Sequence, residues 1–267
     1  MILSSVIWNV DPEIFRIGSF AVRWYGLLFA LGFVLGYIIM GKIFKSENIP
    51  SKILDTLTTY MVVGTIIGAR LGHCLFYEPE YYLSNPLLIL KVWEGGLASH
   101  GAAIGILVAL YLFSRKVKKS YIWILDRIVI VIALAGFCIR MGNLMNSEIY
   151  GIETGLPWGF IFERENETVA KHPTQIYEGL SYLLIFFLLY FIYRKETKNL
   201  KAGTIFGLFL ILLFSVRFII EFVKEPQVGF EAGMALNMGQ LLSLPFIAAG
   251  IYILGRALMT ERSSRKK

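Results

Sequence analysis

Seven long apolar stretches limit what this chain can fold into, because a helix needs about 20 apolar residues to cross a bilayer. They cover residues 20–41, 54–77, 97–114, 122–140, 177–193, 203–222 and 237–257. Backbone groups cannot stay unpaired in lipid, so each stretch is expected to be a helix. Only 17% of the 267 residues are charged, whereas soluble domains have about a quarter. The sequence predicts an all-α integral membrane protein, with about seven transmembrane helices in a single domain over residues 1–267.

The net charge of +7 is explained by membrane topology. If the N-terminus lies outside, the cytoplasmic loops and tail hold 17 of the 26 basic residues and 5 of the 19 acidic ones. This excess of Lys and Arg is typical of the cytoplasmic side of a membrane. We therefore expect a multi-pass protein with an outer N-terminus and a cytoplasmic C-terminus, and no nucleic-acid partner.

The longest outer segment in this topology is about residues 141–176. It contains GIETGLPWGFIFERENETVAKHPTQ, in which glycine, proline and alternating aromatic residues are typical of turns and short strands. We expect a small outward-facing cap or arm.

Polar residues cluster at the outer ends of the apolar stretches. The fourth stretch leads into RMGNLMNSEIYG, which carries Arg140, Asn143, Asn146 and Glu148. The other clusters are Arg23 and Tyr25; Arg70 and His73; His100; His172, Gln175, Tyr177 and Glu178; and Arg217, Glu221 and Lys224. A single arginine can extend to the nearest interface, but that explanation fits several clusters on one side poorly. Intramembrane charges are costly, so the pattern predicts a polar cavity open to the outer leaflet.

The residue types in these clusters favour an anionic head group. The cavity is expected to bring together Arg70, Arg140, Arg217 and Lys224 with few nearby acidic residues, and arginine binds phosphate well. Serine-hydrolase motifs are absent. The dispersed aspartates and histidines predict no metal site, and no cofactor is expected. Histidine is the remaining group that titrates near neutral pH, which favours transfer chemistry at a phospholipid ester.

RMGNLMNSEIYG resembles the signature of bacterial prolipoprotein diacylglyceryl transferases, R-x-G-N-x-x-N-x-E-x-x-G. The resemblance extends from about residue 9 to 245 through VRWYGLLFALGF, GARLGHCLFY, GGLASHGAAIG, LPWGFIF, HPTQIYEG and RFIIEFVKEPQ. It implies seven transmembrane helices in the bacterial cytoplasmic (inner) membrane, with the N-terminus outside and the active site towards the outer leaflet.

The resemblance also implies a reaction, the first step of bacterial lipoprotein maturation. The sn-1,2-diacylglyceryl group of phosphatidylglycerol moves to the lipobox cysteine thiol of a preprolipoprotein. A thioether forms and glycerol phosphate leaves. The implied partners are phosphatidylglycerol, preprolipoprotein signal peptides with a lipobox cysteine, and the lipid bilayer.

Roles for individual residues follow from the resemblance. Arg140 would hold the phosphate and Arg217 would share its charge, stabilising the leaving group. Asn143, Asn146 and Glu148 would orient the phosphate and the glyceryl group. The predicted lipid-binding set also includes Gly151, Glu221, Arg70 and His172.

Tyr25 and His100 also match positions that the family treats as essential. His100 is the expected general base, since a thiol with a pKa of about 8.5 is mostly protonated at neutral pH. His172 remains an alternative base.

Two positions differ from the common family pattern. Lys224 stands where many relatives have arginine, and Ile152 follows Gly151 where arginine is frequent. Lysine can meet a phosphate as a point charge but cannot make a bidentate contact.

Two other functions would also use a site for an anionic lipid. A phospholipid or anion transporter would need charged residues through the bundle and at the inner face, so the one-sided placement argues against it. A head-group transferase would share the phosphate site but would need no groove for a cysteine peptide.

Overall fold

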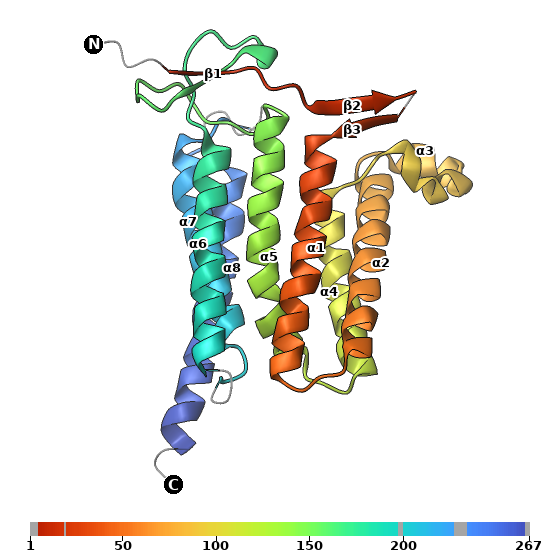
Figure 1. Cartoon of the computed structure of the whole chain (residues 1–267), viewed down its shortest axis with the longest axis vertical. Coiled ribbons are helices and arrows are strands. Elements are labelled where there is room, and N and C mark those ends of the chain that lie inside the picture. The colour runs from red at the N-terminus through yellow and green to blue at the C-terminus, as the bar shows by residue number, and fades with distance from the viewer. Residues whose placement is uncertain (1–4, 19, 197–199, 227–233, 265–267) are drawn as a thin grey trace. The chain divides into compact units, whose positions relative to one another are not determined.

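The fold is mostly helical, with a few short strands (Figure 1). The computed structural model describes residues 5–18, 20–196, 200–226 and 234–264. The α-helices are α1 (Trp24–Ser46), α2 (Ser51–Phe76), α3 (Pro79–Ser84), α4 (Ser99–Lys116), α5 (Tyr121–Met145), α6 (Thr174–Glu196), α7 (Thr204–Ile220) and α8 (Met238–Ser264). The strands are β1 (Val6–Trp8), β2 (Glu13–Ile17), β3 (Phe20–Arg23) and β4 (Phe160–Phe162). The 3-10 turns are η1 (Pro86–Leu90), η2 (Val92–Glu94), η3 (Glu163–Glu165) and η4 (Glu221–Val223).

Each of the seven predicted stretches corresponds to a long helix, which confirms the expected fold class. In the described part of the chain, six helices are long and apolar enough to span a membrane. The helix α4 is not among them. It has 18 residues, and its polar ends, from Ser99 and His100 to Arg115 and Lys116, leave a short apolar middle.

The chain divides into two compact units, one of residues 1–38 and 126–267 and the other of residues 39–125. We call them the first and the second unit. In the first, α6, α7 and α8 lie side by side (Figure 1). A β-carbon added to Gly32 of α1 would lie 3.5 Å from the Cα of Ala135 on α5. That close approach packs the start of α1 on α5.

A buried aspartate fixes where α7 begins. Asp126 on α5 is fully buried and accepts hydrogen bonds from the backbone N–H of Gly203, at 2.7 Å, and of Phe206, at 2.9 Å. The first N–H groups of a helix have no partner within the helix. The carboxylate therefore caps α7 from a neighbouring helix.

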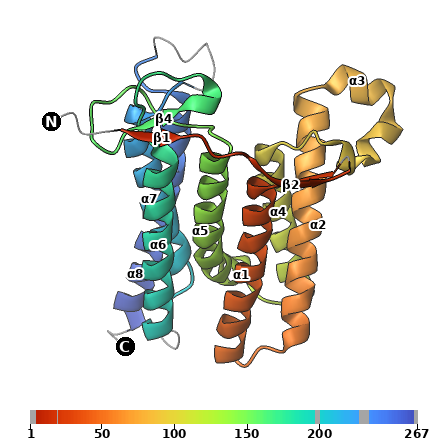
Figure 2. The ribbon, with the colours of Figure 1, turned by 45° about the horizontal axis from the view of Figure 1, so that its top comes forward.

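The segment between α5 and α6 forms the predicted cap. Its strand β4 pairs in parallel with β1, with Val6 opposite Phe160 and Trp8 opposite Phe162 (Figure 2). Strands β2 and β3 form an antiparallel pair near the N-terminus. The predicted limits of 141–176 were too wide, because α5 continues to Met145 and α6 begins at Thr174.

In the second unit, α2 and α4 approach each other at glycines. A β-carbon on Gly64 would lie 2.6 Å from the Cβ of Ala109, and one on Gly68 would contact the carbonyl oxygen of Gly101. Small residues at a spacing of four allow membrane helices to pack this closely. An open apolar groove of about 530 Å³ is lined by the same two helices.

Candidate active site

The polar motif after the fourth apolar stretch begins inside a helix. The stretch was expected to end at residue 140, but α5 runs to Met145, so Arg140 and Asn143 both lie on its last turns. Their spacing of three places them on one face. The Nη1 of Arg140 donates a hydrogen bond to the Oδ1 of Asn143 at 3.2 Å.

The carboxylate of Glu148 accepts hydrogen bonds from both side-chain amides of the motif. Its Oε1 accepts from the Nδ2 of Asn143 at 2.8 Å and from the Nδ2 of Asn146 at 3.2 Å. The structure thus brings together the arginine, the two amides and the carboxylate that the sequence singled out. A chain of hydrogen bonds runs from Arg140 through Asn143 to Glu148.

A strained turn holds Glu148 in place. Ser147 and Ile149 have φ angles of 55° and 62°, in the left-handed region, where a β-branched residue is an outlier. Two residues at the start of α6 hold the turn. Thr174 donates from Oγ1 to the carbonyl of Ile149 at 2.8 Å, and Gln175 donates from Nε2 to the carbonyl of Glu148 at 2.7 Å.

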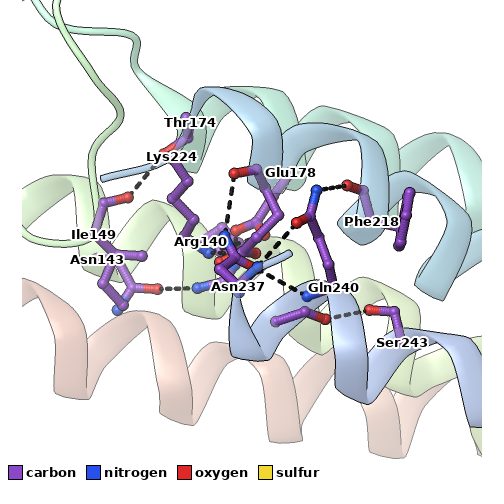
Figure 3. A network of polar contacts seen from close by, with 12 residues as sticks. Arg140, Asn143, Ile149, Thr174, Glu178, Phe218, Lys224, Asn237, Gln240 and Ser243 are labelled. Carbon is purple, nitrogen blue, oxygen red and sulfur yellow. Dashed lines mark hydrogen bonds and ion pairs between the residues drawn. The ribbon is translucent and has the colours of Figure 1, made fainter. Parts of the chain in front are cut away.

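A buried carboxylate on α6 pairs with two cations from other elements. Glu178 is fully buried, and its Oε2 lies 2.5 Å from the Nε of Arg140 (Figure 3). Its Oε1 lies 3.3 Å from the Nζ of Lys224, which follows η4. The Nζ of Lys224 also lies 3.5 Å from the Oε2 of Glu221. The expectation of few acids near these cations is wrong for Arg140 and Lys224, since both pair with Glu178. Glu178 lies far from both along the chain, so the sequence did not reveal the pairing.

Arg217 differs from these two cations. Its side chain on α7 makes no ion pair with any residue in the described ranges, and Tyr182 on α6 lies within electrostatic reach of both Arg217 and Arg140. Tyr25, at the start of α1, is likewise within reach of Arg140 and Glu148. Its ring packs on α5, since a β-carbon on Gly142 would lie 2.8 Å from the Tyr25 Cδ2. Both residues therefore belong to the network around Arg140.

Two residues at the start of α8 hold the end of α7 and the beginning of η4, and they are absent from the set predicted from the sequence. Asn237 and Gln240 form a reciprocal cap, in which the Gln240 N–H donates to Asn237 Oδ1 at 2.9 Å and the Asn237 N–H donates to Gln240 Oε1 at 3.1 Å. Their amides also donate to the carbonyls of Glu221, at 3.3 Å, and Phe218, at 3.4 Å (Figure 3). The spacing Asn-x-x-Gln before an apolar run is a recognisable start signal for a helix and could have identified this cap.

Gly151 joins the cap segment to the end of α7. Its N–H donates to the carbonyl of His172 at 2.8 Å, and it forms an isolated bridge with Lys224. A β-carbon there would contact the Val223 carbonyl oxygen and lie 2.7 Å from the Cβ of His172. Only glycine fits this close approach. In the described chain Gly151 is packed against backbone and neighbouring side chains.

His172 lies between Gly151 and an aromatic pair. Its Nδ1 is 3.2 Å from the hydroxyl of Tyr177, which accepts a hydrogen bond of 2.9 Å from the indole N–H of Trp158. Burial lowers the pKa of His172 below its ordinary value. The imidazole is therefore neutral at neutral pH.

Arg70, in the second unit, contacts backbone carbonyls. Its Nε donates to Ile89 at 2.9 Å, its Nη1 to Gly95 at 2.6 Å and its Nη2 to Leu88 at 2.6 Å. The arginine thereby fastens the chain that leads from α3 to α4. It was predicted to bind lipid, and that prediction stays untested.

His100 is exposed at the start of α4, in the same unit as Arg70. An exposed imidazole at a helix start can accept a proton from an incoming group. Within the described ranges, no group of three or more His, Cys, Asp or Glu side chains could hold a metal ion.

The network in the first unit suits an oxyanion. Arg140 keeps N–H groups beyond those that meet Glu178 and Asn143, since a guanidinium has five. Arg217 adds a positive charge that the described carboxylates leave unpaired. Guanidinium groups in a partly buried site bind phosphate strongly and resist loss of their charge.

Known proteins resemble this chain over nearly its whole length. Residues 12–256 match the family described as prolipoprotein diacylglyceryl transferase. The phosphatidylglycerol–prolipoprotein diacylglyceryl transferase of Tolumonas auensis is 51% identical over 250 residues, covering 93% of this chain and 96% of that protein. The protein of the same name from Porphyromonas gingivalis is 47% identical, with 95% of each chain covered. That from Chloroherpeton thalassium is 44% identical, with 94% of each covered.

Proposed function

We propose, from the premise that this chain belongs to the prolipoprotein diacylglyceryl transferase family, that the network around Arg140 is its phosphate site. The protein is a multi-pass membrane enzyme that transfers the diacylglyceryl group of phosphatidylglycerol to prolipoproteins. The placement of the substrates on particular residues, the chemical steps and the orientation in the membrane form our proposal.

One observation carries the placement of the phosphate. Arg140 and Arg217 come from different helices, α5 and α7, and both lie close enough to Tyr182 for their charges to be felt there. Arg217 has no carboxylate partner among the described residues, so it is the cation most available to an anion. The phosphate of phosphatidylglycerol would be held by Arg217 and by the free N–H groups of Arg140.

The amide groups beside the arginines support a role in orienting the glyceryl part of the lipid. Asn143 and Asn146 are both held by Glu148, which fixes their direction. Glycerol hydroxyls and ester oxygens can both exchange hydrogen bonds with amides and carboxylates. Tyr25, packed against Gly142, supplies a further hydroxyl at this side of α5.

The proposed transfer is a displacement at carbon. The lipobox cysteine sulfur attacks the sn-3 carbon of the diacylglyceryl group, so that a carbon–sulfur bond forms while the carbon–oxygen bond to phosphate breaks. The bonding electrons leave with that oxygen, as glycerol phosphate. Arg140 and Arg217 stabilise the charge that develops on the phosphate, which is the general role of fixed cations in such sites.

The thiol proton needs an acceptor, and we assign this role to His100. A thiolate attacks far better than a thiol, whose ordinary pKa is about 8.5. His100 is exposed at the start of α4, so an incoming peptide can reach it. His172 is the second candidate. Its contacts with Gly151 and Tyr177 favour a structural role, because both fix the imidazole within the cap.

A reconstitution experiment tests this function. The purified protein is incubated with phosphatidylglycerol and a lipobox peptide, and the products are analysed by mass spectrometry. We expect a diacylglyceryl peptide and glycerol phosphate, and no lipidated product from a peptide with serine in place of cysteine. Lipid movement without a modified peptide would favour a transporter, and a new lipid without it would favour a head-group transferase.

The expected orientation places the cap outside the cell and the active site towards the outer leaflet of the bacterial cytoplasmic membrane. Asn166 in the cap is exposed, whereas position 198, expected in a cytoplasmic loop, lies outside the described residues. In a variant without Cys74 and Cys138, an impermeant thiol reagent added outside should label Asn166→Cys. It should spare Arg115→Cys, which is exposed at the end of α4 and belongs to another expected cytoplasmic loop. The reverse pattern would invert the topology.

A further inference from the structure

Glu178 is a buried carboxylate to which the proposed reaction assigns no step. It belongs to the HPTQIYEG motif and lies near the start of α6, with none of its surface exposed. Taking an ionised carboxylate out of water costs several kcal/mol unless it is paired. Its position therefore requires an explanation beyond the packing of α6.

The contacts of Glu178 join three separate parts of the chain. One carboxylate oxygen lies 2.5 Å from Arg140 Nε on α5, and the other lies 3.3 Å from Lys224 Nζ after η4 (Figure 3). The next residue, Gly179, allows the approach, because a β-carbon there would lie 2.7 Å from the Met141 Cε and 3.4 Å from the Arg140 Cβ. A larger residue there would require the Met141 side chain to move and would crowd the Arg140 Cβ.

These contacts fix the direction of the Arg140 guanidinium. Glu178 forms a close ion pair at the Nε, although its Oε2 accepts no hydrogen bond from the described residues, and Asn143 accepts a hydrogen bond from Nη1. A planar group held at two of its nitrogens cannot rotate freely, so the remaining N–H groups point in one set direction. Without the carboxylate, Asn143 and the nearby Tyr182 would be left to hold the group, and the long arginine side chain could take more rotamers.

The same carboxylate also sets the charge balance. Glu178 and Glu221 together match Arg140 and Lys224, and Lys224 lies between the two carboxylates at 3.3 and 3.5 Å. Arg217 stands outside this balanced set. Glu178 thus holds two cations of like charge close together, which would otherwise repel each other.

We infer that Glu178 is a positioning residue, which holds Arg140 by Nε and Lys224 by Nζ so that Arg140 meets the phosphate in a fixed orientation. The inference rests on the proposed phosphate site. Glu178 itself does not touch the substrate. Because misplacing a reacting group by about 1 Å can cost about 100-fold in rate, the orientation of Arg140 should matter more for turnover than for lipid binding.

The experiment compares Glu178→Gln with the parent, with Arg140→Gln and with the double variant, using phosphatidylglycerol and a lipobox peptide. Glutamine has the same shape, but its amide nitrogen cannot accept from a cation. We expect kcat to fall about 10- to 100-fold, with the KM for phosphatidylglycerol within about threefold of the parent, since both cations remain. Glu13→Gln, which alters an exposed ion pair with Arg16, is the control and should keep the parent kcat.

The double variant separates positioning from a general structural role. If Glu178 acts through Arg140, Glu178→Gln adds no further loss of kcat once Arg140 is glutamine. Multiplicative losses, or a parent-like kcat in Glu178→Gln, would overturn the inference. If Glu178→Gln does not fold, Glu178→Asp keeps the charge on a shorter arm and should show the same loss of kcat with little change in KM. A parent-like kcat in that variant would also overturn the inference.

The outcomes distinguish this inference from the proposed function. A slow Arg140→Gln beside a normal Glu178→Gln would remove the positioning role and leave the phosphate site intact. Near-normal turnover in Arg140→Gln would instead contradict the phosphate site itself.

Discussion

Two arginines near the ends of long helices, the half-buried Arg140 in the first unit and the buried Arg70 in the second, meet very different partners. Arg140 pairs with the carboxylate of Glu178 and the amide of Asn143, which are side chains. Arg70 donates to four backbone carbonyls, those of Leu88, Ile89, Gly95 and Gly96. From the sequence both arginines were expected to bind lipid, because each is a cation at the outer end of an apolar stretch.

The partners suggest different tasks. Backbone carbonyls are fixed by the chain. An arginine whose three nitrogens all donate to such carbonyls therefore stabilises the conformation of a loop. Side-chain partners can move, and a guanidinium with N–H groups to spare can meet a ligand. The contacts favour Arg70 as a structural residue of the chain before α4, and Arg140 as part of a binding site.

The largest effect is expected for Arg217→Gln, which tests whether the arginines of the first unit bind the phosphate. We expect a loss of about 10²- to 10³-fold in kcat/KM, the usual effect of removing one charge-stabilising donor. Arg217 has no ion pair with the described residues, so the midpoint of thermal unfolding should stay close to that of the parent. Turnover by the detergent-purified variant is measured beside its unfolding curve. Parent-like turnover in a folded variant would contradict a phosphate role.

His100→Gln tests whether the second unit contributes chemistry at all. General-base help is worth about 10²- to 10⁴-fold, and we expect the lower end at pH 7. Raising the pH to about 9 increases the thiolate fraction of a cysteine with a pKa of about 8.5 by more than tenfold. The variant should therefore recover more than the parent does. A deficit that does not change with pH, with phosphatidylglycerol binding intact, would move the base to His172 or to neither histidine.

Arg70→Lys should affect stability rather than chemistry. Lysine keeps the charge but cannot reach all four carbonyls that the guanidinium meets. Each lost hydrogen bond from a charged group is worth about 1.5–3 kcal/mol, so thermal unfolding should shift downward while kcat per folded molecule stays within a few-fold. A large loss of kcat without loss of stability would restore Arg70 to the lipid-binding set.

The smallest effect is expected at His172. Burial lowers its folded-state pKa, whereas in the unfolded chain it titrates near its ordinary value of about 6.5. Its contribution to stability is therefore present above pH 6.5 and is lost as the pH falls through the lowered folded value. Thermal unfolding of the parent and of His172→Gln at pH 7.5 and pH 5.5 measures this. The variant should lose less stability on acidification, and an equal loss would show that His172 is not the group that titrates.

The sequence predicted the helices well, because long apolar runs identify membrane spans directly. It also located Arg140, Asn143 and Glu148, since these lie within one turn or two of each other in the chain. It could not pair Arg140 with Glu178, which comes from another helix. Nor could it find the partners of Arg70, because backbone carbonyls carry no signal in the sequence.

The limits of α5 show why the ends of elements were harder to place. Hydropathy drops at Arg140, yet the helix continues to Met145, because Glu148 and Arg140 satisfy the polar side chains of Asn143 and its neighbours. A polar helical turn is stable where tertiary partners exist. Those partners become visible only in the folded chain.

The turn at Ser147 and Ile149 has a consequence for anyone who tries to make this enzyme more heat-resistant. Left-handed backbone costs an ordinary residue about 1–2 kcal/mol, and glycine would remove that penalty at position 149. A screen for thermal tolerance would therefore favour Ile149→Gly. The same change would make the backbone more mobile at the carbonyls that accept hydrogen bonds from Thr174 and Gln175. The side chain of Glu148 would then be less firmly oriented. Here the engineer would gain robustness at the expense of catalytic geometry.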